Sequence, residues 1–332
     1  MTVRIGTRAS KLALTQTQQT ADRLAAVGGF DVELVHVRTD GDVLTGSLSQ
    51  MGGTGVFVAA LRDALLRNEC DVAVHSLKDL PTGSAPGLAL AATPPRVDVR
   101  DVLCARDGLK LADLPKGARV GTGSPRRAAQ LRAVRPDLDI VDIRGNVDTR
   151  LGRVPGLPGN TTEAVVEGKS CDLDAVILAA AGLERIGRLD TVTEYLETDI
   201  MLPAAGQGSL AIECRTAEAP RRAGSTEGSQ GVLAQALAAL DDADTRLAVT
   251  AERALLARLE AGCAAPVGAY AYRKGSMLHL EAVVCAVDGT ASVRDKRATD
   301  GLTEVGATLL GIELAEVLLA AGAADIADLT AS

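Results

Sequence analysis

Two series of alternating strand-like and helix-like segments do most to limit how this chain can fold. The first series has strand-like apolar runs at 3–6, 32–37 and 71–75, separated by segments with helical periodicity. The second series starts at 119–121, beyond a linker-like stretch at 94–101. Strands that alternate with helices form parallel sheets joined by right-handed crossovers. The pattern therefore predicts two α/β domains that face each other across a cleft.

The last third of the chain follows a different order. A strong helical pattern is followed by three strand-like runs and then by a second helical pattern; the five segments are 244–259, 267–272, 277–287, 291–299 and 303–319. Neighbouring strands with short connections pair antiparallel. This region predicts a small α+β domain with an antiparallel sheet.

Charge and composition exclude several classes of function. The net charge is −8 and aromatic residues make up only 2% of the 332 residues, which argues against binding to nucleic acid or to anionic membranes. No apolar run has the length of a signal peptide core or of a membrane span. The six cysteines and three histidines have no metal-ligand spacing, and a disulfide framework is not expected in a chain of this kind. We predict a cytoplasmic protein with reduced thiols and no metal.

Polar residues gather where four of the predicted strands end. They are Arg8 with Ser10, Lys78 with Asp79, Ser124 with Arg126 and Arg127, and Arg144 with Arg150. Ligands of open α/β sheets bind beyond the carboxyl ends of the strands, so these clusters are expected to line one cleft. Ser124 and Pro125 also open a helix, whose first N–H groups favour an anion. The sequence predicts a ligand with several carboxylates or phosphates.

Three further residues each allow a functional and a structural interpretation. Asp79 is the one carboxylate in the basic group and could stabilise a developing cation, although its local sequence favours a turn residue before Pro81. His75 could act as a base, but a histidine that ends an apolar strand is more often packed. Cys263 has small neighbours on both sides, which weakly suggests a reactive thiol, whereas a buried cysteine is the default.

The motifs around these residues resemble those of the porphobilinogen deaminase family. They occur in the family's order and span nearly the whole chain: RIGTRAS at 4–10, VHSLKDLP at 74–81, GTGSPRR at 121–127, RGNVDTRL at 144–151, LPAAGQGSLAIECR at 202–215, TAERALL at 250–256 and LEAGC at 259–263. The resemblance implies three domains, the first two like the lobes of a type-II periplasmic binding protein. Domain 1 would comprise 1–97 and 200–217, domain 2 would comprise 101–195, and domain 3, with Cys263, would comprise 222–332.

The resemblance also implies a transferase of tetrapyrrole biosynthesis. Members of the family join four porphobilinogen molecules head to tail, with loss of ammonia, and release hydroxymethylbilane. The chain grows on a dipyrromethane cofactor, which a thioether would attach here to Cys263. Porphobilinogen is the expected partner, and a monomer is expected.

The family's site residues carry over onto matching positions of this sequence. Asp79 would be catalytic and would hydrogen-bond pyrrole N–H groups. The cofactor would be held by Cys263, Lys78, Asp79, Ser124, Arg126, Arg127 and Arg150. The substrate would be bound by Arg8, Ser10, Arg144, Arg150, Arg185 and Gln207.

Three positions depart from the family pattern. Thr54 stands where a lysine is frequent, Gly123 stands where a second serine is common, and 155–164 resembles an insertion in a loop. Two alternatives remain open at this point. A non-catalytic two-lobed anion-binding protein would have no need of Cys263 or Asp79. A phosphoribosyl-type transferase would require acidic Mg²⁺ ligands, for which we find no convincing set.

Overall fold

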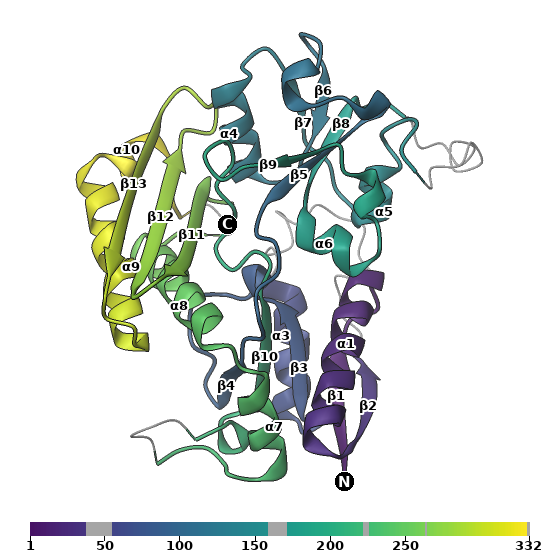
Figure 1. Ribbon diagram of the computed structural model, residues 1–332, viewed down its shortest axis with the longest axis vertical. Coiled ribbons are helices and arrows are strands. Elements are labelled where there is room, and N and C mark those ends of the chain that lie inside the picture. The colour runs from purple at the N-terminus through teal and green to yellow at the C-terminus, as the bar shows by residue number, and fades with distance from the viewer. Residues whose placement is uncertain (38–54, 159–170, 222–225, 263, 331–332) are drawn as a thin grey trace.

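A computed structural model describes residues 1–37, 55–158, 171–221, 226–262 and 264–330, and it contains three β-sheets. Each sheet forms the centre of one domain, as the sequence predicts. Figure 1 shows two lobes stacked one above the other, with the third domain beside both. Thr54 and most of the expected insertion lie outside the described residues.

The first lobe has a five-stranded sheet in the order β2-β1-β3-β10-β4. Its strands are β1 (Thr2–Thr7), β2 (Asp31–His36), β3 (Val72–Ser76), β4 (Leu88–Ala92) and β10 (Leu210–Arg215), and its helices are α1 (Lys11–Gly28), α3 (Gly55–Leu66) and α7 (Val232–Leu240). Ser10 caps α1 as predicted, because its hydroxyl accepts a hydrogen bond from the Ala13 N–H at 3.3 Å. The α7 helix and the β10 strand were not predicted.

The second lobe repeats this arrangement with the order β7-β6-β8-β5-β9. Its strands are β5 (Asp101–Ala105), β6 (Arg119–Gly121), β7 (Asp139–Val141), β8 (Ala175–Ala179) and β9 (Glu194–Leu196), and its helices are α4 (Pro125–Val134), α5 (Val147–Leu151) and α6 (Ala180–Arg185). Short 3₁₀ turns occur at Leu77–Asp79, Arg106–Gly108, Leu111–Asp113, Leu189–Thr191 and Thr216–Glu218.

The expectation of parallel sheets holds for only part of the sheet in each lobe. β10 runs antiparallel to β3 and β4, and β5 runs antiparallel to β8 and β9. Each of these strands arrives from the opposite lobe through a crossing segment, so it enters its sheet from the far end. The remaining pairs that join β1 to β2 and β3, and β6 to β7 and β8, are parallel.

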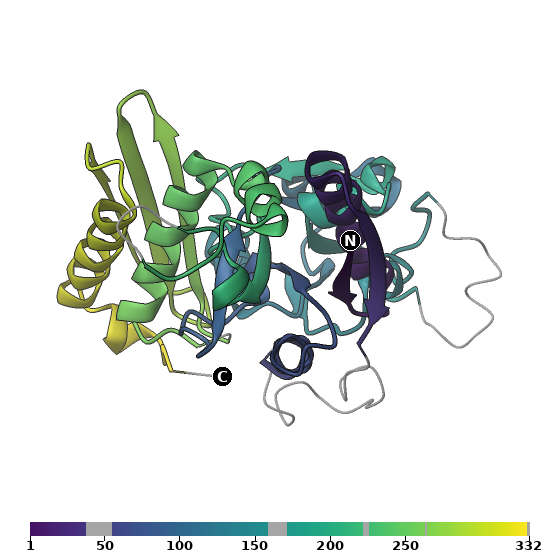
Figure 2. The ribbon, with the colours of Figure 1, turned by 90° about the horizontal axis from the view of Figure 1, so that it is seen from below.

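The third domain is the predicted α+β unit, with an antiparallel sheet of three strands. The strands are β11 (Val267–Lys274), β12 (Met277–Cys285) and β13 (Ser292–Thr299), and the helices are α8 (Ala243–Arg258), α9 (Glu304–Ala320) and α10 (Ala323–Ile326). One face of the sheet packs against α8 and α9 and forms an aliphatic core that includes Leu255, Leu280 and Leu314. Figure 2 shows this domain to one side of the lobes.

A buried ion pair ties the third domain to both crossing segments. The Arg96 guanidinium, in the first crossing segment, lies 2.6 Å from Glu252 of α8, a residue with no exposed surface. Glu252 also accepts hydrogen bonds from the backbone N–H groups of Gly206 (2.6 Å) and Ala271 (2.7 Å). Arg96 donates a second hydrogen bond to the Gln207 carbonyl oxygen at 2.8 Å. Both segments that connect the two lobes are therefore joined to the third domain by one buried charged contact.

Candidate functional site

Two adjoining cavities lie where β1 and β3 end. The larger has a volume of about 140 Å³ and contains Arg8, Ser10, His75 and Asp79 among its lining residues. The smaller, about 30 Å³, reaches toward the second lobe and is lined by Lys78, Arg185 and Gln207 among others. Leu12, Gln16 and Ser76 line both cavities, so the two are neighbours. Six of the predicted site residues that the structure describes thus border one continuous region between the lobes.

Lys78 and Asp79 form a 3₁₀ turn that directly follows β3. The turn is anchored by Leu77, whose side chain is buried, while Lys78 points into the cleft and lies 3.4 Å from the Gln207 side-chain oxygen. Although Lys78 is exposed in the open cleft, desolvation by the cleft walls and the charge of the nearby Arg127 outweigh Asp79 and Asp101 and lower its pKa to about 8. Lys78 is therefore a cation that a bound anion would stabilise.

Arg126 and Arg127 open α4, but their guanidinium groups are almost completely buried. The Asp101 carboxylate of β5 lies 2.8 Å from Arg126 Nη2 and 2.8 Å from Arg127 Nη2. The Gln207 amide donates to the same carboxylate at 2.8 Å. Burial opposes ionisation of Asp101, yet the two guanidinium groups hold the pKa of this carboxyl well below its usual range. Ser124 caps the helix as predicted, since its hydroxyl accepts from the Arg127 N–H at 3.5 Å.

The remaining predicted arginines are less buried than this pair. Burial lowers the pKa of Arg150, and the charges of Arg127 and Arg144 lower it further, so these three cations repel one another. Arg144 lies at the exposed rim, 3.1 Å from Asp142. Burial lowers the pKa of Arg185 to about 10, and its guanidinium donates to the Gly208 carbonyl oxygen at 2.8 Å. The cluster thus holds more positive charge than its own carboxylates balance.

Gly123 has no room for the second serine that the family pattern suggests. A Cβ atom at this position would lie too close to the Ile143 backbone carbonyl oxygen. The backbone before α4 approaches the backbone that follows β7 so closely that only glycine fits at position 123, and the serine hydroxyl is therefore absent.

Two contributors to the site were not predicted from the sequence. Asp101 ends a charged run and starts an apolar strand, which is an unremarkable position until the fold brings α4 against it. Gln16 lies on the buried face of α1, and its amide donates to the Ser76 hydroxyl at 3.2 Å. Hydrophobic periodicity predicts the strand and the helix that carry these two residues, but no local sequence signal marks either residue as part of a site.

Cys263 lies outside the described residues, and the segment on its N-terminal side is hydrogen-bonded to the segment near residue 329. α8 ends at Arg258, and the Gly262 N–H donates to the Leu329 carbonyl oxygen at 2.8 Å. The other five cysteines are free thiols. Within the described ranges, no group of His, Cys, Asp and Glu has an arrangement that would hold a metal ion, and no helix is long and apolar enough to cross a membrane.

Comparison with known proteins identifies close relatives over the whole chain. Residues 3–222 match the family model described as porphobilinogen deaminase, dipyromethane cofactor binding domain, and residues 246–320 match porphobilinogen deaminase, C-terminal domain. The porphobilinogen deaminase of Cutibacterium acnes is 55% identical and aligns over 99% of this chain and 98% of its own length. The enzyme of the same name from Leifsonia xyli is 54% identical, over 98% of this chain and 94% of its own.

Among solved structures, a periplasmic substrate-binding protein of an ABC transporter from Coxiella burnetii is a remote match. It is 13% identical, has a TM-score of 0.41, and covers 72% of this chain and 91% of its own. The sequence relatives and both family models, which between them reach from residue 3 to residue 320, are far more specific. Together with the basic cleft around Asp79, they show that the chain belongs to the porphobilinogen deaminase family.

Proposed function

We propose that the cleft between the two lobes is where this transferase joins four porphobilinogen molecules into hydroxymethylbilane, and we assign roles to its residues. The observation that carries the assignment is the surplus of cations along the cleft that contains Asp79, from Arg8 and Lys78 to Arg127 and Arg150. Each pyrrole of the product carries an acetate and a propionate, so a growing chain brings many carboxylates into the cleft. A non-catalytic anion-binding protein of the same shape is not favoured by the family match.

The donor set of the cleft fits the dipyrromethane cofactor of this family. Burial and the charge of Arg127 lower the pKa of both Lys78 and Arg150, and carboxylates placed between these cations would relieve that repulsion. We propose that Cys263 holds the cofactor by a thioether and that its carboxylates are bound by Lys78, Ser124, Arg126, Arg127 and Arg150. When bound, the dipyrromethane supplies the pyrrole to which the first porphobilinogen is joined. Arg126 and Arg127 are held in place by Asp101, which fixes their positive charge at the start of α4.

Asp79 is the proposed catalytic carboxylate. It lines the larger cavity and follows a buried strand, so its backbone is rigidly placed. Loss of ammonia from porphobilinogen leaves a positive charge that spreads onto the pyrrole nitrogen. A carboxylate fixed beside that N–H group stabilises the charge as it develops.

The incoming porphobilinogen is assigned to the outer part of the same region. We propose that Arg8, Ser10, Arg144, Arg150, Arg185 and Gln207 bind its carboxylates. Arg8 and Ser10 line the larger cavity, and Arg185 and Gln207 line the smaller one, which supports a path from one to the other. Arg144 lies at the rim, where an entering ring would pass first.

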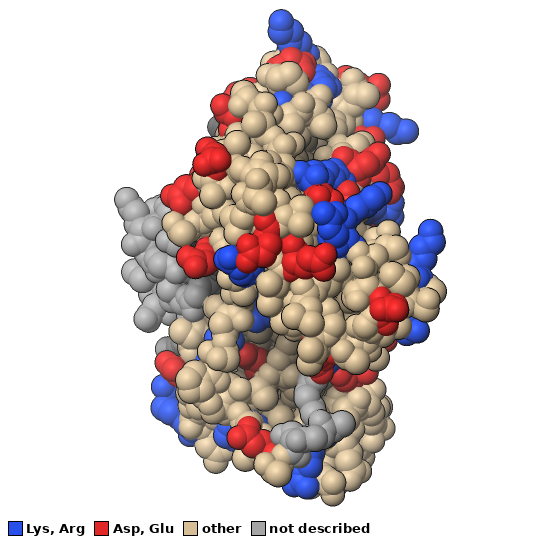
Figure 3. Space-filling view, turned by 90° about the vertical axis from the view of Figure 1, so that its left-hand side faces the viewer, with Lys and Arg blue, Asp and Glu red and all other residues tan. Residues whose placement is uncertain are grey.

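The last part of the proposal concerns the domain boundaries, the cellular location and the oligomeric state. The boundaries 1–97 with 200–217 and 101–195 are supported by the placement of β10 beside β3 and of β5 beside β8. The expected start of domain 3 at 222 is too early, because α7 packs in the core of the first lobe, and we propose that domain 3 begins after α7 and ends at 332. Free thiols at five positions fit a reducing cytoplasm. On the face drawn in Figure 3, basic and acidic side chains are interspersed, which suits a monomer that has small molecules as its partners. Light scattering and cell fractionation test these two points.

Intact mass measurement tests the assignment directly. The denatured wild-type protein is expected to exceed its chain mass by two linked pyrroles derived from porphobilinogen, and the Cys263→Ala variant is expected to have the bare chain mass. Arg127→Leu should fail to gain the extra mass when porphobilinogen is added. Equal masses for wild type and Cys263→Ala, before and after incubation with porphobilinogen, would refute the attachment site.

A further inference from the structure

His75 lies between the larger cavity and a buried ion pair, and the proposal above leaves it without a role. It is the fourth residue of β3, four residues before Asp79, and its side chain is 4% exposed. On one side it lines the cavity that also contains Asp79, Arg8 and Ser10. On the other side its Nε2 atom lies 3.2 Å from Glu213 Oε2 of β10.

Glu213 is fixed as an anion in this position. The Arg62 guanidinium of α3 makes two contacts with its carboxylate, from Nη2 to Oε1 at 2.8 Å and from Nε to Oε2 at 3.0 Å. Burial opposes ionisation of Glu213, but His75 and Arg62 outweigh it and lower the pKa of the carboxyl to about 2. An ionised carboxylate only accepts hydrogen bonds. The contact with His75 Nε2 has an ion-pair distance without hydrogen-bond alignment, and the charge of the carboxylate favours a hydrogen on that nitrogen.

This contact decides which nitrogen of His75 is free to accept a proton. When Nε2 carries the hydrogen of a neutral imidazole, Nδ1 has the lone pair. The histidine is thus oriented by a buried carboxylate in the way that a general base is oriented in many enzymes.

Charged groups approach His75 from each element packed around it. Glu213 lies on β10 and Arg62 on α3, and Asp79 and Arg8 border the same cavity from the ends of β3 and β1. Arg253 of α8 is near enough for its charge to interact with Glu213 and Arg62. Arg253 also donates to the Leu80 and Pro81 carbonyl oxygens at 3.0 and 2.7 Å, so the third domain braces the turn that carries Asp79.

We propose that His75 is a catalytic proton carrier for the condensation, a role that rests on the proposed function of this cleft. In each condensation the protonated aminomethyl group of the incoming porphobilinogen loses its carbon–nitrogen bond. Neutral ammonia leaves with the electron pair of that bond, and the positive charge stays on the pyrrole. The α-carbon of the acceptor pyrrole forms the new carbon–carbon bond and then loses its proton, which restores the aromatic ring. His75 Nδ1 accepts this proton and passes it to the released ammonia, which departs as ammonium. Protons and charge balance without any further reactant.

Electrostatics explains why cation stabilisation is assigned to Asp79 and proton transfer to His75. Asp79 stabilises the cation only while it is ionised. If Asp79 also accepted the proton, it would lose its charge while the pyrrole chain in the site still awaits the next cationic ring. A neutral imidazole beside it accepts the proton and leaves the carboxylate charged.

Isotope effects separate this role from a structural one. We compare wild type, His75→Gln, Glu213→Gln and, as a control, His36→Gln, since His36 is an exposed histidine on β2. Each variant is first checked for cofactor by intact mass, which tests the proposed function separately. His75→Gln is expected to lower kcat at least about 100-fold with little change in KM. With porphobilinogen deuterated at its free α-carbon, it should show a primary isotope effect larger than that of wild type, because proton removal becomes slow.

Two results would overturn the proposal. One is a His75→Gln variant that carries cofactor and keeps kcat within twofold of wild type. The other is a lowered kcat with no increase in the isotope effect, which would leave His75 a packing residue.

If His75→Gln does not fold or acquire cofactor, nitrogen NMR on the wild-type holoenzyme decides instead. With only three histidines in the chain, the His75 ring signals can be assigned by comparison with His36→Gln and His279→Gln. We expect hydrogen on Nε2, and a change in the Nδ1 shift when porphobilinogen is added. Hydrogen on Nδ1, or an unchanged Nδ1 shift, contradicts the role.

Discussion

Replacing Asp101 by asparagine should destabilise the second lobe more than any surface change of the same kind. Asp101 has no exposed surface and is contacted by Arg126 and Arg127, whose side chains are 5% and 6% exposed. The substitution keeps the shape but leaves two buried guanidinium groups without a counter-charge. Removing one partner of a buried ion pair costs about 3–5 kcal/mol. We expect a loss of that size in the free energy of unfolding.

The matched control is Asp98→Asn, three residues earlier in the same crossing segment. Asp98 pairs with Arg100 at 2.7 Å, but both side chains are 31% exposed. A half-exposed pair of this kind contributes about 0–1 kcal/mol. Urea denaturation gives the stability difference, and hydrogen exchange at β5 and β8 shows whether the second lobe opens first. A loss below about 1 kcal/mol for Asp101→Asn would refute the reasoning.

The pH dependence of the same pair has a definite sign. Because the folded pKa of Asp101 lies below its unfolded value, the pair contributes its full stability above the ordinary carboxyl pKa, and that contribution is lost as pH falls toward the folded pKa. Asp101→Asn should therefore lose less stability on acidification than wild type does.

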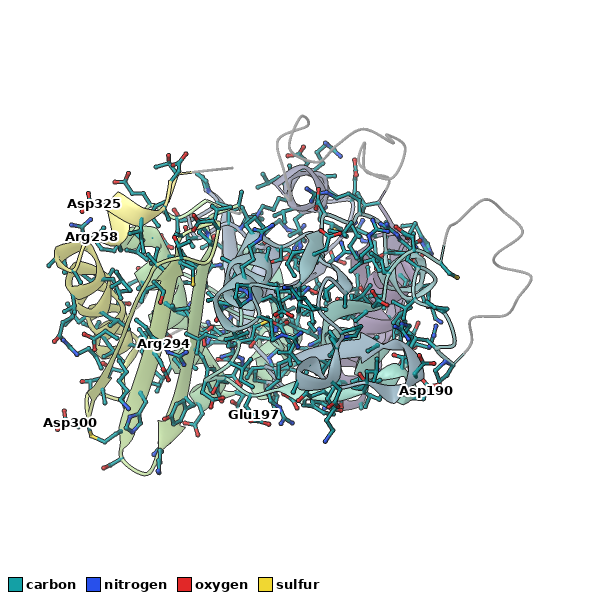
Figure 4. All side chains as sticks on the ribbon, turned by 90° about the horizontal axis from the view of Figure 1, so that it is seen from above. Asp190, Glu197, Arg258, Arg294, Asp300 and Asp325 are labelled. Atoms are coloured by element: carbon teal, nitrogen blue, oxygen red, sulfur yellow. The ribbon has the colours of Figure 1, made fainter. Side chains whose placement is uncertain are left out.

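Three other predictions follow from the structure. Glu252→Gln should lower the free energy of unfolding by about 3–5 kcal/mol in urea denaturation, because it leaves the buried Arg96 unpaired. Glu316→Gln breaks an exposed pair with Arg258 at the outer end of domain 3 (Figure 4) and should cost less than about 1 kcal/mol. Equal losses for the two variants would contradict this prediction. Lys78, with a pKa of about 8, should be the first lysine acetylated at pH 8 in the Cys263→Ala variant, as measured by peptide mass mapping. Its binding of carboxylates should weaken as the pH rises through 8. Acetylation of Lys78 no faster than that of Lys274 would be evidence against the lowered pKa. Gly123→Ser should lower the free energy of unfolding by about 1–3 kcal/mol, because its Cβ atom would clash with the Ile143 carbonyl oxygen. Gly83→Ser should be neutral, because no atom lies within 4 Å of the added Cβ. A neutral Gly123→Ser would show that the segment before α4 can shift.

Local sequence signals predicted the elements of this fold well. Ser10 and Ser124 cap their helices through the hydrogen bonds expected of them, and the apolar runs became strands with boundaries within a few residues. The strand directions could not be predicted in the same way. β5 and β10 look like any buried strand, and their antiparallel placement depends on the crossing segments that deliver them.

In the candidate site, too, local sequence patterns predict some residues, whereas others can be found only from the tertiary structure. Polar clusters after strands led to the prediction of Lys78, Asp79 and most of the arginines, because a rule about sheet edges needs only the order of the elements. The balance of charge inside the cleft depends on Asp101, which no local rule selects and which the fold places between Arg126 and Arg127. His75 illustrates the point from the other direction. Its sequence position favoured a packed histidine, and it is packed, yet the residue it packs against is a buried carboxylate and the space it borders contains Asp79. Burial and function are therefore not alternatives for this residue: a histidine oriented by a fixed anion on one side can act as a base only because the other side opens onto the cavity.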